Sequence, residues 1–246
     1  MDVIEIGKIV LLCLFAYLFG SIPFGYIIAW AKGVNIQKSG SGNIGGTNVG
    51  RTLGRKYGFW AGTLDAWKGA VPLIMAMYFF KSTWWIVGLV FLFCMLGAVF
   101  SIWLKILKGK FRAGKGVGTL VGGLLVLTGW KWLILVGCWL FALRFLVRGK
   151  VSAASLILAA SILLLISVIP DLLYISPVVL LIIVGLVWWT HGENIKRLIE
   201  NKEPSVSLKL PKFFPAWSQR AFDKIPDDLV GFVLEKVRNF LKKLVK

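Results

Sequence analysis

The sequence predicts an all-α integral membrane protein, a bundle of about seven transmembrane helices with cytoplasmic glycine-rich loops and a C-terminal amphipathic helix. Three observations support this fold class. Of the 246 residues, 58% are hydrophobic and 16% are charged, whereas soluble domains are roughly 45–50% apolar and about 25% charged. Apolar runs of about twenty residues, long enough to cross a bilayer, recur along the chain. The cations that produce the net charge of +18 lie mostly between these runs and in the C-terminal tail.

The apolar runs define the predicted spans, which are residues 9–30, 57–80, 83–104, 115–129, 131–147, 152–170 and 175–191. In the first span, Gly20, Ser21 and Pro23 predict a kink that faces protein rather than lipid. In the fourth, Gly118 and Gly122 have the spacing that lets another helix approach closely. The three cysteines all lie in apolar runs without C-x-x-C spacing. They therefore predict neither a disulfide framework nor a metal site.

Lys and Arg residues alternate between the loops in a way that predicts the orientation of the chain. The first, third and fifth loops and the tail after His191 hold nearly all of them, whereas the second and fourth loops hold Lys81 and Lys131 alone. Because cytoplasmic loops carry an excess of cations, the C-terminus should be cytoplasmic and the N-terminus outside. The sequence contains no soluble basic domain, so the charge favours anionic membrane lipid and anionic substrates over nucleic acid.

The chain is predicted to consist of a polytopic membrane domain, residues 1–203, and a basic cytoplasmic tail, residues 204–246. Within residues 227–246, apolar side chains recur on one helical face and cations lie on the other. This pattern predicts an amphipathic helix on the anionic inner surface of the membrane. Docking on a partner protein is the alternative interpretation.

Two glycine-rich, cationic loops are predicted on the cytoplasmic side. The first, residues 38–51, reads K-S-G-S-G-N-I-G-G-T-N-V-G-R, and the second, residues 109–116, reads G-K-F-R-A-G-K-G. Such segments offer many backbone N–H groups and short polar side chains to an anion. Each could wrap a phosphate, one with Arg51 and the other with Lys115. Alternatively, each is a tight connection whose cations only obey the positive-inside rule.

Two nucleotide-binding motifs are matched in part and rejected. Residues 40–45 satisfy G-x-G-x-x-G, but a predicted membrane span precedes them where a dinucleotide site needs a βαβ unit. Residues 109–116 resemble a Walker A loop, but Gly116 stands where Ser or Thr should hold magnesium. The sequence therefore predicts no nucleotide cofactor.

Asp65 and Lys68 are ionisable residues inside the second predicted span. Charged groups at such depth are costly and usually face the bundle interior in pairs. The spacing favours a structural ion pair that supports the site, with a catalytic pair as the alternative.

His191 is the only histidine in the chain and closes the last predicted span, with Asn194 three residues later on the same helical face. No second histidine is present to complete a metal site with it, and no Ser–His–Asp order is found. Either His191 belongs to an active site, or it is a structural residue at the membrane interface. An enzyme with so few catalytic groups should act on an activated substrate, for which positioning and charge stabilisation suffice.

Five motifs follow one another along the chain: G-S-G-N-I-G-G-T-N-V-G-R-T-L-G-R-K-Y-G, L-D-A-W-K-G, A-G-K-G-V-G-T, V-S-A-A-S and H-G-E-N-I-K-R-L. In this order, over residues 8–203, they resemble the bacterial acyl-phosphate glycerol-3-phosphate acyltransferases. The resemblance implies a seven-span enzyme of the bacterial cytoplasmic (inner) membrane that needs no cofactor. Its substrates would be acyl-phosphate and glycerol-3-phosphate, and its products lysophosphatidic acid and phosphate, as in the first step of phospholipid synthesis.

The resemblance also implies roles for particular residues. Those implied to take part in catalysis are Ser41, His191 and Asn194. Those implied to bind the substrate phosphates are Asn43, Thr47, Asn48, Arg51, Lys115 and Ser152. The glycines that shape the two loops are Gly40, Gly42, Gly45, Gly114 and Gly116.

The chain departs from the family pattern at several positions. The family usually has Gly-His-x-x-Pro before the second loop, whereas this chain has Gly97, Ala98, Val99, Phe100 and Ser101. Because of Ala98, a paralogue with another acceptor, or one without activity, is an alternative. A transporter of small organic anions is a further alternative, but it would need polar residues through the spans, and few are present beyond Asp65, Lys68 and Arg144.

Overall fold

The structure, a computed structural model, describes residues 2–80, 83–131, 139, 150–165, 175–200 and 202–204. In these residues the regular elements are helices, as the sequence predicted, and an isolated bridge joins Phe100 and Arg112. The elements are α1 (Val3–Gly20), α2 (Phe24–Ala31), the 3₁₀ helix η1 (Ile36–Lys38), α3 (Gly46–Leu53), α4 (Arg55–Phe79), α5 (Trp84–Val99), α6 (Ile102–Lys108), α7 (Val117–Thr128), the 3₁₀ helix η2 (Gly129–Lys131), α9 (Val151–Leu165), α10 (Pro177–Thr190) and α11 (Gly192–Ile199).

The chain divides into two compact units. The first unit comprises Met1–Leu133 and Ala159–Gly192, and the second comprises Ile134–Leu158 and Glu193–Lys246. The predicted fifth span and the predicted amphipathic helix of the tail lie outside the described residues, apart from Lys131 and Trp139.

The predicted kink in the first span is confirmed. Helix α1 ends at Gly20, Ser21 caps it, and α2 begins at Phe24 after Pro23. Among the described residues, the stretch Val3–Ala31 is long and apolar enough to cross a membrane, and α10 and α11 form a second such stretch if they count as one broken span. Helices α5, α7 and α9 are apolar but shorter. The count of seven spans therefore stays a prediction.

Helix α4 is central to the first unit, where it packs against α7, α5, α3 and α1. Its contact with α7 depends on glycines, as the sequence predicted for Gly118 and Gly122. A Cβ atom on Gly122 would collide with the backbone carbonyl of Ala66, and one on Gly118 would lie 2.7 Å from Cβ of Asp65. The two backbones can approach this closely because no side chain stands between them.

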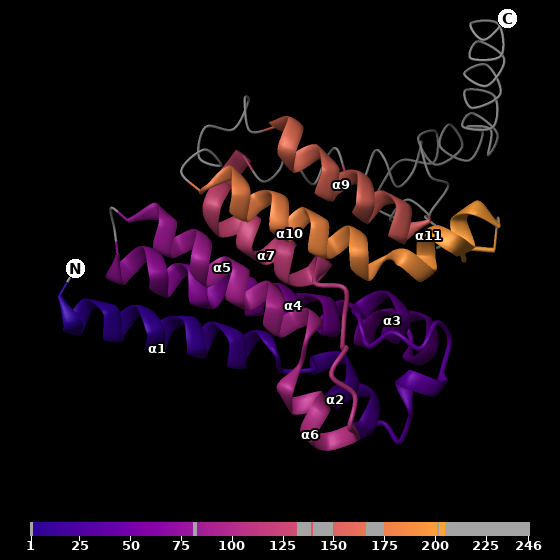
Figure 1. Ribbon diagram of the computed structural model, residues 1–246. Helices are drawn as coiled ribbons and strands as arrows, with labels where there is room; N and C mark the ends of the chain where they lie inside the picture. Colours follow the sequence, from indigo (N-terminus) through magenta and orange to yellow (C-terminus); the bar gives the residue numbers. More distant parts are fainter. Residues whose placement is uncertain are drawn as a thin grey trace, which may run out of the picture. The chain divides into compact units, whose positions relative to one another are not determined.

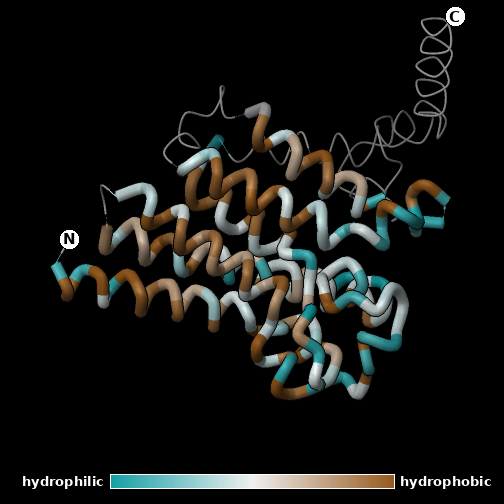
Figure 2. Tube along the Cα trace, viewed as in Figure 1, coloured by the Kyte–Doolittle hydropathy of each residue, from teal (hydrophilic) through white to brown (hydrophobic). Residues whose placement is uncertain are grey.

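Hydrophobic and polar residues separate along the first unit. In Figure 2, hydrophobic colouring runs along α1, α5, α7 and α10, while hydrophilic residues gather in the loops around α3 and α6. Figure 1 shows α2, α3 and α6 at the same end of this unit. Both glycine-rich loops therefore belong to one polar end of the first unit.

The α4–α7 contact predicts that Gly122→Ala destabilises the protein. The added methyl group would force the two backbones apart, and overpacking of this kind costs typically about 1–3 kcal/mol. Thermal unfolding of the purified protein in detergent would measure the loss. Gly185→Ala on α10 is the matched control, since among the described residues no atom lies within 4 Å of a Cβ atom there. Equal losses in the two variants would contradict a tight α4–α7 contact.

Candidate active site

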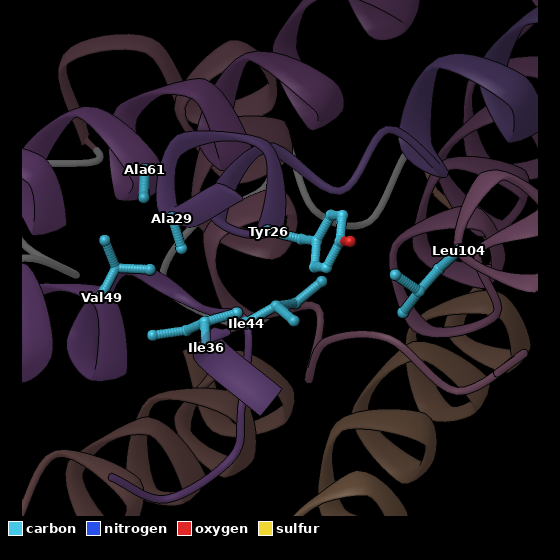
Figure 3. Close-up of a cluster of buried hydrophobic side chains, with 7 residues drawn as sticks. All are labelled: Tyr26, Ala29, Ile36, Ile44, Val49, Ala61 and Leu104. Atoms are coloured by element: carbon cyan, nitrogen blue, oxygen red, sulfur yellow. The ribbon is translucent and has the colours of Figure 1, made fainter. Parts of the chain in front are cut away.

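The first glycine-rich loop is anchored by its apolar residues. Ile36, Ile44 and Val49 are buried together with residues of α2, α4 and α6, namely Tyr26, Ala29, Ala61 and Leu104 (Figure 3). Ser41 and Thr47, between these anchors, and Arg51, two residues after the last one, are exposed. Burial of the apolar side chains thus leaves the polar side chains of the loop accessible to a substrate.

The side chain of Asn48 holds the backbone of this loop. It is 2% exposed, and its Oδ1 accepts a hydrogen bond of 2.9 Å from the N–H of Ser41. Its Nδ2 donates to the carbonyls of Ser39, at 2.9 Å, and Asn43, at 2.8 Å. The resemblance implied that Asn48 binds phosphate, but both amide hydrogens have backbone partners. The structure therefore assigns Asn48 to the support of the loop. The N–H of Ser41 belongs to the same support, because it donates to Oδ1 of Asn48.

The conformation of the loop also requires glycine. Gly40 and Gly42 have φ angles of 57° and 72°, in the left-handed region that other residues rarely adopt. Asn43 follows them, and its Oδ1 accepts a hydrogen bond of 2.8 Å from the N–H of Gly45. Helix α3 then begins at Gly46 without a side-chain cap. The N–H groups of its first turn are donors of the kind that bind phosphate.

The second glycine-rich loop is held by backbone hydrogen bonds to the end of α5. The N–H of Ser101 donates to the carbonyl of Phe111, at 2.9 Å, and the N–H of Ala113 donates to that of Val99, at 2.8 Å. The N–H of Gly114 donates to the carbonyl of Ala98, at 3.3 Å. These bonds use only main-chain atoms of residues 98, 99 and 101, so they do not need the side chain of the histidine that the family usually has at position 98.

Lys115 follows at the end of this loop, directly before the N-terminus of α7. Gly116 separates it from the helix and has a φ angle of 75°. The hydroxyl of Thr190, the last residue of α10, shares its proton between two backbone carbonyls, that of Val187 at 2.8 Å and that of Lys115 at 3.3 Å. Within the first unit, the bond to Lys115 joins the second loop to the residue before His191.

His191 is buried, with 1% of its surface exposed. Its Nδ1 lies 2.7 Å from the backbone carbonyl oxygen of Val187. Because a carbonyl only accepts hydrogen bonds, Nδ1 must carry a proton, and a neutral ring then has its lone pair on Nε2. Of the two nitrogens, Nε2 is the one that could exchange a proton with a substrate. Burial and this contact leave both interpretations of His191 open, an active-site residue or a structural residue at the end of the helix.

In the second unit, Ser152 and Asn194 share one partner that the sequence analysis missed. The Ser152 hydroxyl and Nδ2 of Asn194 each donate to Oε1 of Glu203, both at 2.7 Å. Nε of Arg197 donates to Oε2, at 2.9 Å. The only sequence signal for Glu203 is that it is the second of two acids, after Glu200, that follow the basic segment of α11. Ser152 and Asn194 were expected to contact substrate, which stays a prediction, and the structure shows that each also donates to this carboxylate.

The carboxylate of Glu203 is stabilised in its charged form. Burial raises the pKa of Glu203. The hydrogen bonds from Ser152, Arg197 and Asn194, together with the charge of Arg197, lower this pKa by more than burial raises it. The net pKa lies below the ordinary value of 4.5. At neutral pH, Glu203 is therefore an anion that accepts from all three side chains.

The predicted pair of Asp65 and Lys68 is an ion pair, with 2.7 Å between Oδ1 and Nζ. Lys68 is 4% exposed, and its ammonium group lies 5.4 Å from the ring centroid of Phe24. Thr119 donates to the backbone carbonyl of Asp65, at 3.2 Å. Asp65 thus lies at the α4–α7 contact, while Lys68 reaches α2, and the structural role of the pair stays a prediction. Among the described residues, no group of three His, Cys, Asp or Glu residues could hold a metal ion.

Comparison with known proteins gives a consistent result. A family model described as glycerol-3-phosphate acyltransferase matches residues 10–201. A relative of that name from Aquifex aeolicus is 35% identical over 199 residues, which cover 80% of this chain and 98% of the relative. A relative of the same name from Gluconobacter oxydans is 40% identical over 212 residues, which cover 82% and 95%.

Solved structures show the same similarity. A crystal structure of PlsY (YgiH), described as an integral membrane glycerol 3-phosphate acyltransferase in its glycerol 3-phosphate form, matches with a TM-score of 0.71 and 33% identity. The match covers 81% of this chain and 96% of that one. The lysophosphatidic acid form of the same protein matches with a TM-score of 0.69. The all-helical fold of this chain is thus similar to that of an integral membrane protein.

The geometry around Glu203 predicts that Glu203→Gln destabilises the second unit. Glutamine keeps one acceptor oxygen but places an NH₂ group against a donor, and an unsatisfied buried group costs about 1–3 kcal/mol. The folded-state pKa of Glu203 is lowered, so its contribution to stability is present above the unfolded-state pKa and is lost as the pH falls through the folded-state pKa. The difference in melting temperature between wild type and variant should therefore shrink from pH 7 toward pH 3.

Glu200→Gln is the control for this experiment. Glu200 forms a more exposed pair with Lys202, at 3.1 Å, and such pairs contribute about 0–1 kcal/mol. A difference between wild type and Glu203→Gln that stays constant over this pH range would contradict the proposed network.

Proposed function

The chain belongs to the glycerol-3-phosphate acyltransferase family, and we propose that it transfers an acyl group from acyl-phosphate to the 1-hydroxyl of glycerol-3-phosphate. The ester bond to the acceptor forms as the bond to the donor phosphate breaks, which gives lysophosphatidic acid and phosphate. The observation that carries this proposal is the pair of cationic glycine-rich loops in the first unit. Each substrate contains a phosphate group, so a reaction between them needs two anion sites near each other.

The choice of donor follows from the catalytic groups available. Acyl-phosphate is already activated, because phosphate is a good leaving group. Its reaction therefore needs positioning and charge stabilisation more than a nucleophilic residue. We assign the uncapped N-terminus of α3, the hydroxyls of Ser41 and Thr47, the amide of Asn43 and the guanidinium of Arg51 to one phosphate. Lys115 is assigned to the other.

His191 is assigned the proton of the acceptor hydroxyl. With its Nδ1 proton donated to the carbonyl of Val187, Nε2 has the lone pair that a general base requires. The alternative base is a phosphate oxygen of the substrate itself. The two routes differ in whether loss of the imidazole slows turnover. Ser152 and Asn194 take a supporting part in this proposal, through their hydrogen bonds to Glu203.

We further propose that the enzyme lies in a bacterial cytoplasmic membrane as a multi-pass protein, surrounded by membrane lipid, with its N-terminus outside. The cations of the loops support this orientation, since Lys38, Arg51, Lys110 and Lys115 all belong to predicted cytoplasmic segments. The tail, residues 204–246, would then lie on the cytoplasmic side, where its predicted amphipathic helix would meet anionic lipid.

Cysteine labelling tests the orientation. A cysteine in place of Lys110, which is exposed, should react with an impermeant maleimide only after the cytoplasmic side is opened. A cysteine in place of Ser82 should react in intact cells, because the second loop is predicted to face outward. The opposite pattern would reject the orientation and with it a cytoplasmic site.

Purified protein supplied with radiolabelled acyl-phosphate and glycerol-3-phosphate should form lysophosphatidic acid. Lys115→Ala should lower kcat/KM on the order of 10²–10⁴-fold, because a bound phosphate loses a cation in a partly desolvated site. His191→Gln should lower turnover at least about a hundredfold, which is the usual contribution of a general base.

Lys110→Ala is the control, since Lys110 is an exposed lysine of the same loop. Near-normal kinetics in Lys115→Ala would mean that Lys115 does not bind substrate and only contributes to the excess of cations that sets the orientation of the protein in the membrane. Retained turnover in His191→Gln would make the substrate phosphate the base. Without any product from the wild type, the proposed donor or acceptor is wrong.

A further inference from the structure

Arg112 is a cation of the second glycine-rich loop whose side chain contacts protein groups. Its guanidinium carbon lies 4.8 Å from the ring centroid of Trp189, near the end of α10. One of its terminal nitrogens donates to the backbone carbonyl of Thr190, at 3.2 Å. From its sequence position alone, Arg112 would resemble a phosphate ligand, because it lies three residues before Lys115. Its contacts are with α10 instead.

Aromatic rings complete this contact. The ring of Phe100 stacks on that of Phe111, with 5.4 Å between centroids, and lies 5.7 Å from that of Trp189. The hydroxyl of Tyr17, on α1, donates to the carbonyl of Phe100, at 2.9 Å. Trp189 therefore contacts both Phe100 and Arg112, and these residues face each other in the Phe100–Arg112 bridge. Cation–π and aromatic pairs are each favourable when their geometry is of this kind.

The Arg112 contact lies beside two residues of the proposed site. The carbonyl of Thr190 accepts from Arg112, while its hydroxyl donates to the carbonyl of Lys115. His191 is the next residue along the chain. Two links thus join the second loop to Thr190 at the end of α10, one from the side chain of Arg112 and one to the backbone of Lys115. Loss of either link would change the distance between the proposed phosphate-binding cation and the proposed base.

We propose that Arg112 is a positioning residue, which through Trp189 and Thr190 holds Lys115 and His191 in register for the acyl transfer. This inference rests on the proposed function. Displacement of a catalytic group by about 1 Å can lower the rate a hundredfold. Loss of a contact that only positions Lys115 and His191 can therefore lower kcat. Arginine suits the role because its planar group stacks on a ring and donates in its own plane at the same time, which lysine cannot do.

A double-mutant cycle tests this role. Arg112→Ala and Trp189→Leu should each lower kcat on the order of tenfold with little change in KM, and the double variant should be no worse than the poorer single variant, because both remove one contact. Arg112→Lys should recover part of the activity. Trp188→Leu, at a neighbouring exposed tryptophan, and Lys110→Ala should leave kcat unchanged. If Trp189→Leu fails to fold, Trp189→Phe replaces it, with a smaller decrease expected.

Hydrogen–deuterium exchange supplies a readout that does not depend on the reaction. In Arg112→Ala and in Trp189→Leu, amides of residues 109–118 should exchange faster than in wild type, and in the two control variants they should not. If the wild type catalyses no acyl transfer, the proposed function fails, and the exchange data alone decide whether the contact holds the loop. Unchanged exchange in both variants would overturn the inference. So would a rise in KM for Arg112→Ala with normal kinetics in Trp189→Leu, since Arg112 would then bind substrate.

Discussion

The hydrogen bonds of Asn48 are the constraint on which the polar end of the first unit depends. A segment with five glycines between residues 38 and 51 loses much conformational entropy when it takes one shape. One buried amide offsets part of this cost by joining the backbone of residues 39, 41 and 43. The apolar anchors Ile36, Ile44 and Val49 supply the rest by burial. As a result, the backbone that leads into α3 has a defined shape, and α3 itself carries both the N-terminal N–H groups and Arg51.

Glycine has a different role in the loops and in the helices. Glycines in the loops let the chain turn and present N–H groups, whereas Gly118 and Gly122 in α7 let two helices touch. Asp65 lies at this contact, beside Gly118 of α7, and its ion pair with Lys68 gives each of these charges an opposite partner. The two glycine-rich loops of the same unit contain Arg51 and Lys115, and cations in such loops suit phosphate-containing substrates.

Glu203 gives the second unit an anion among cations. With Arg197, Ser152 and Asn194 as donors, its carboxylate is satisfied at both oxygens. This network joins two polar side chains that are far apart in sequence, Ser152 and Asn194, through one carboxylate oxygen. The network also adds to the interpretation of Ser152 and Asn194. The family resemblance implies that they contact the substrate, and in the structure both bind Glu203. A side chain held in this way can still position a substrate, but it does so as part of a network.

The sequence by itself determined the features that depend on local composition and spacing. They include the helical fold, the break near Pro23, the close approach at Gly118 and Gly122, the cationic loops and the family. The tertiary structure alone decided which polar groups pair. Asn48 binds carbonyls whose positions depend on the folded loop, Arg112 contacts Trp189 on a distant helix, and Val187 selects the proton-bearing nitrogen of His191. Hydrogen bonds require atoms within about 3 Å in a set direction, and neither periodicity nor composition contains that information.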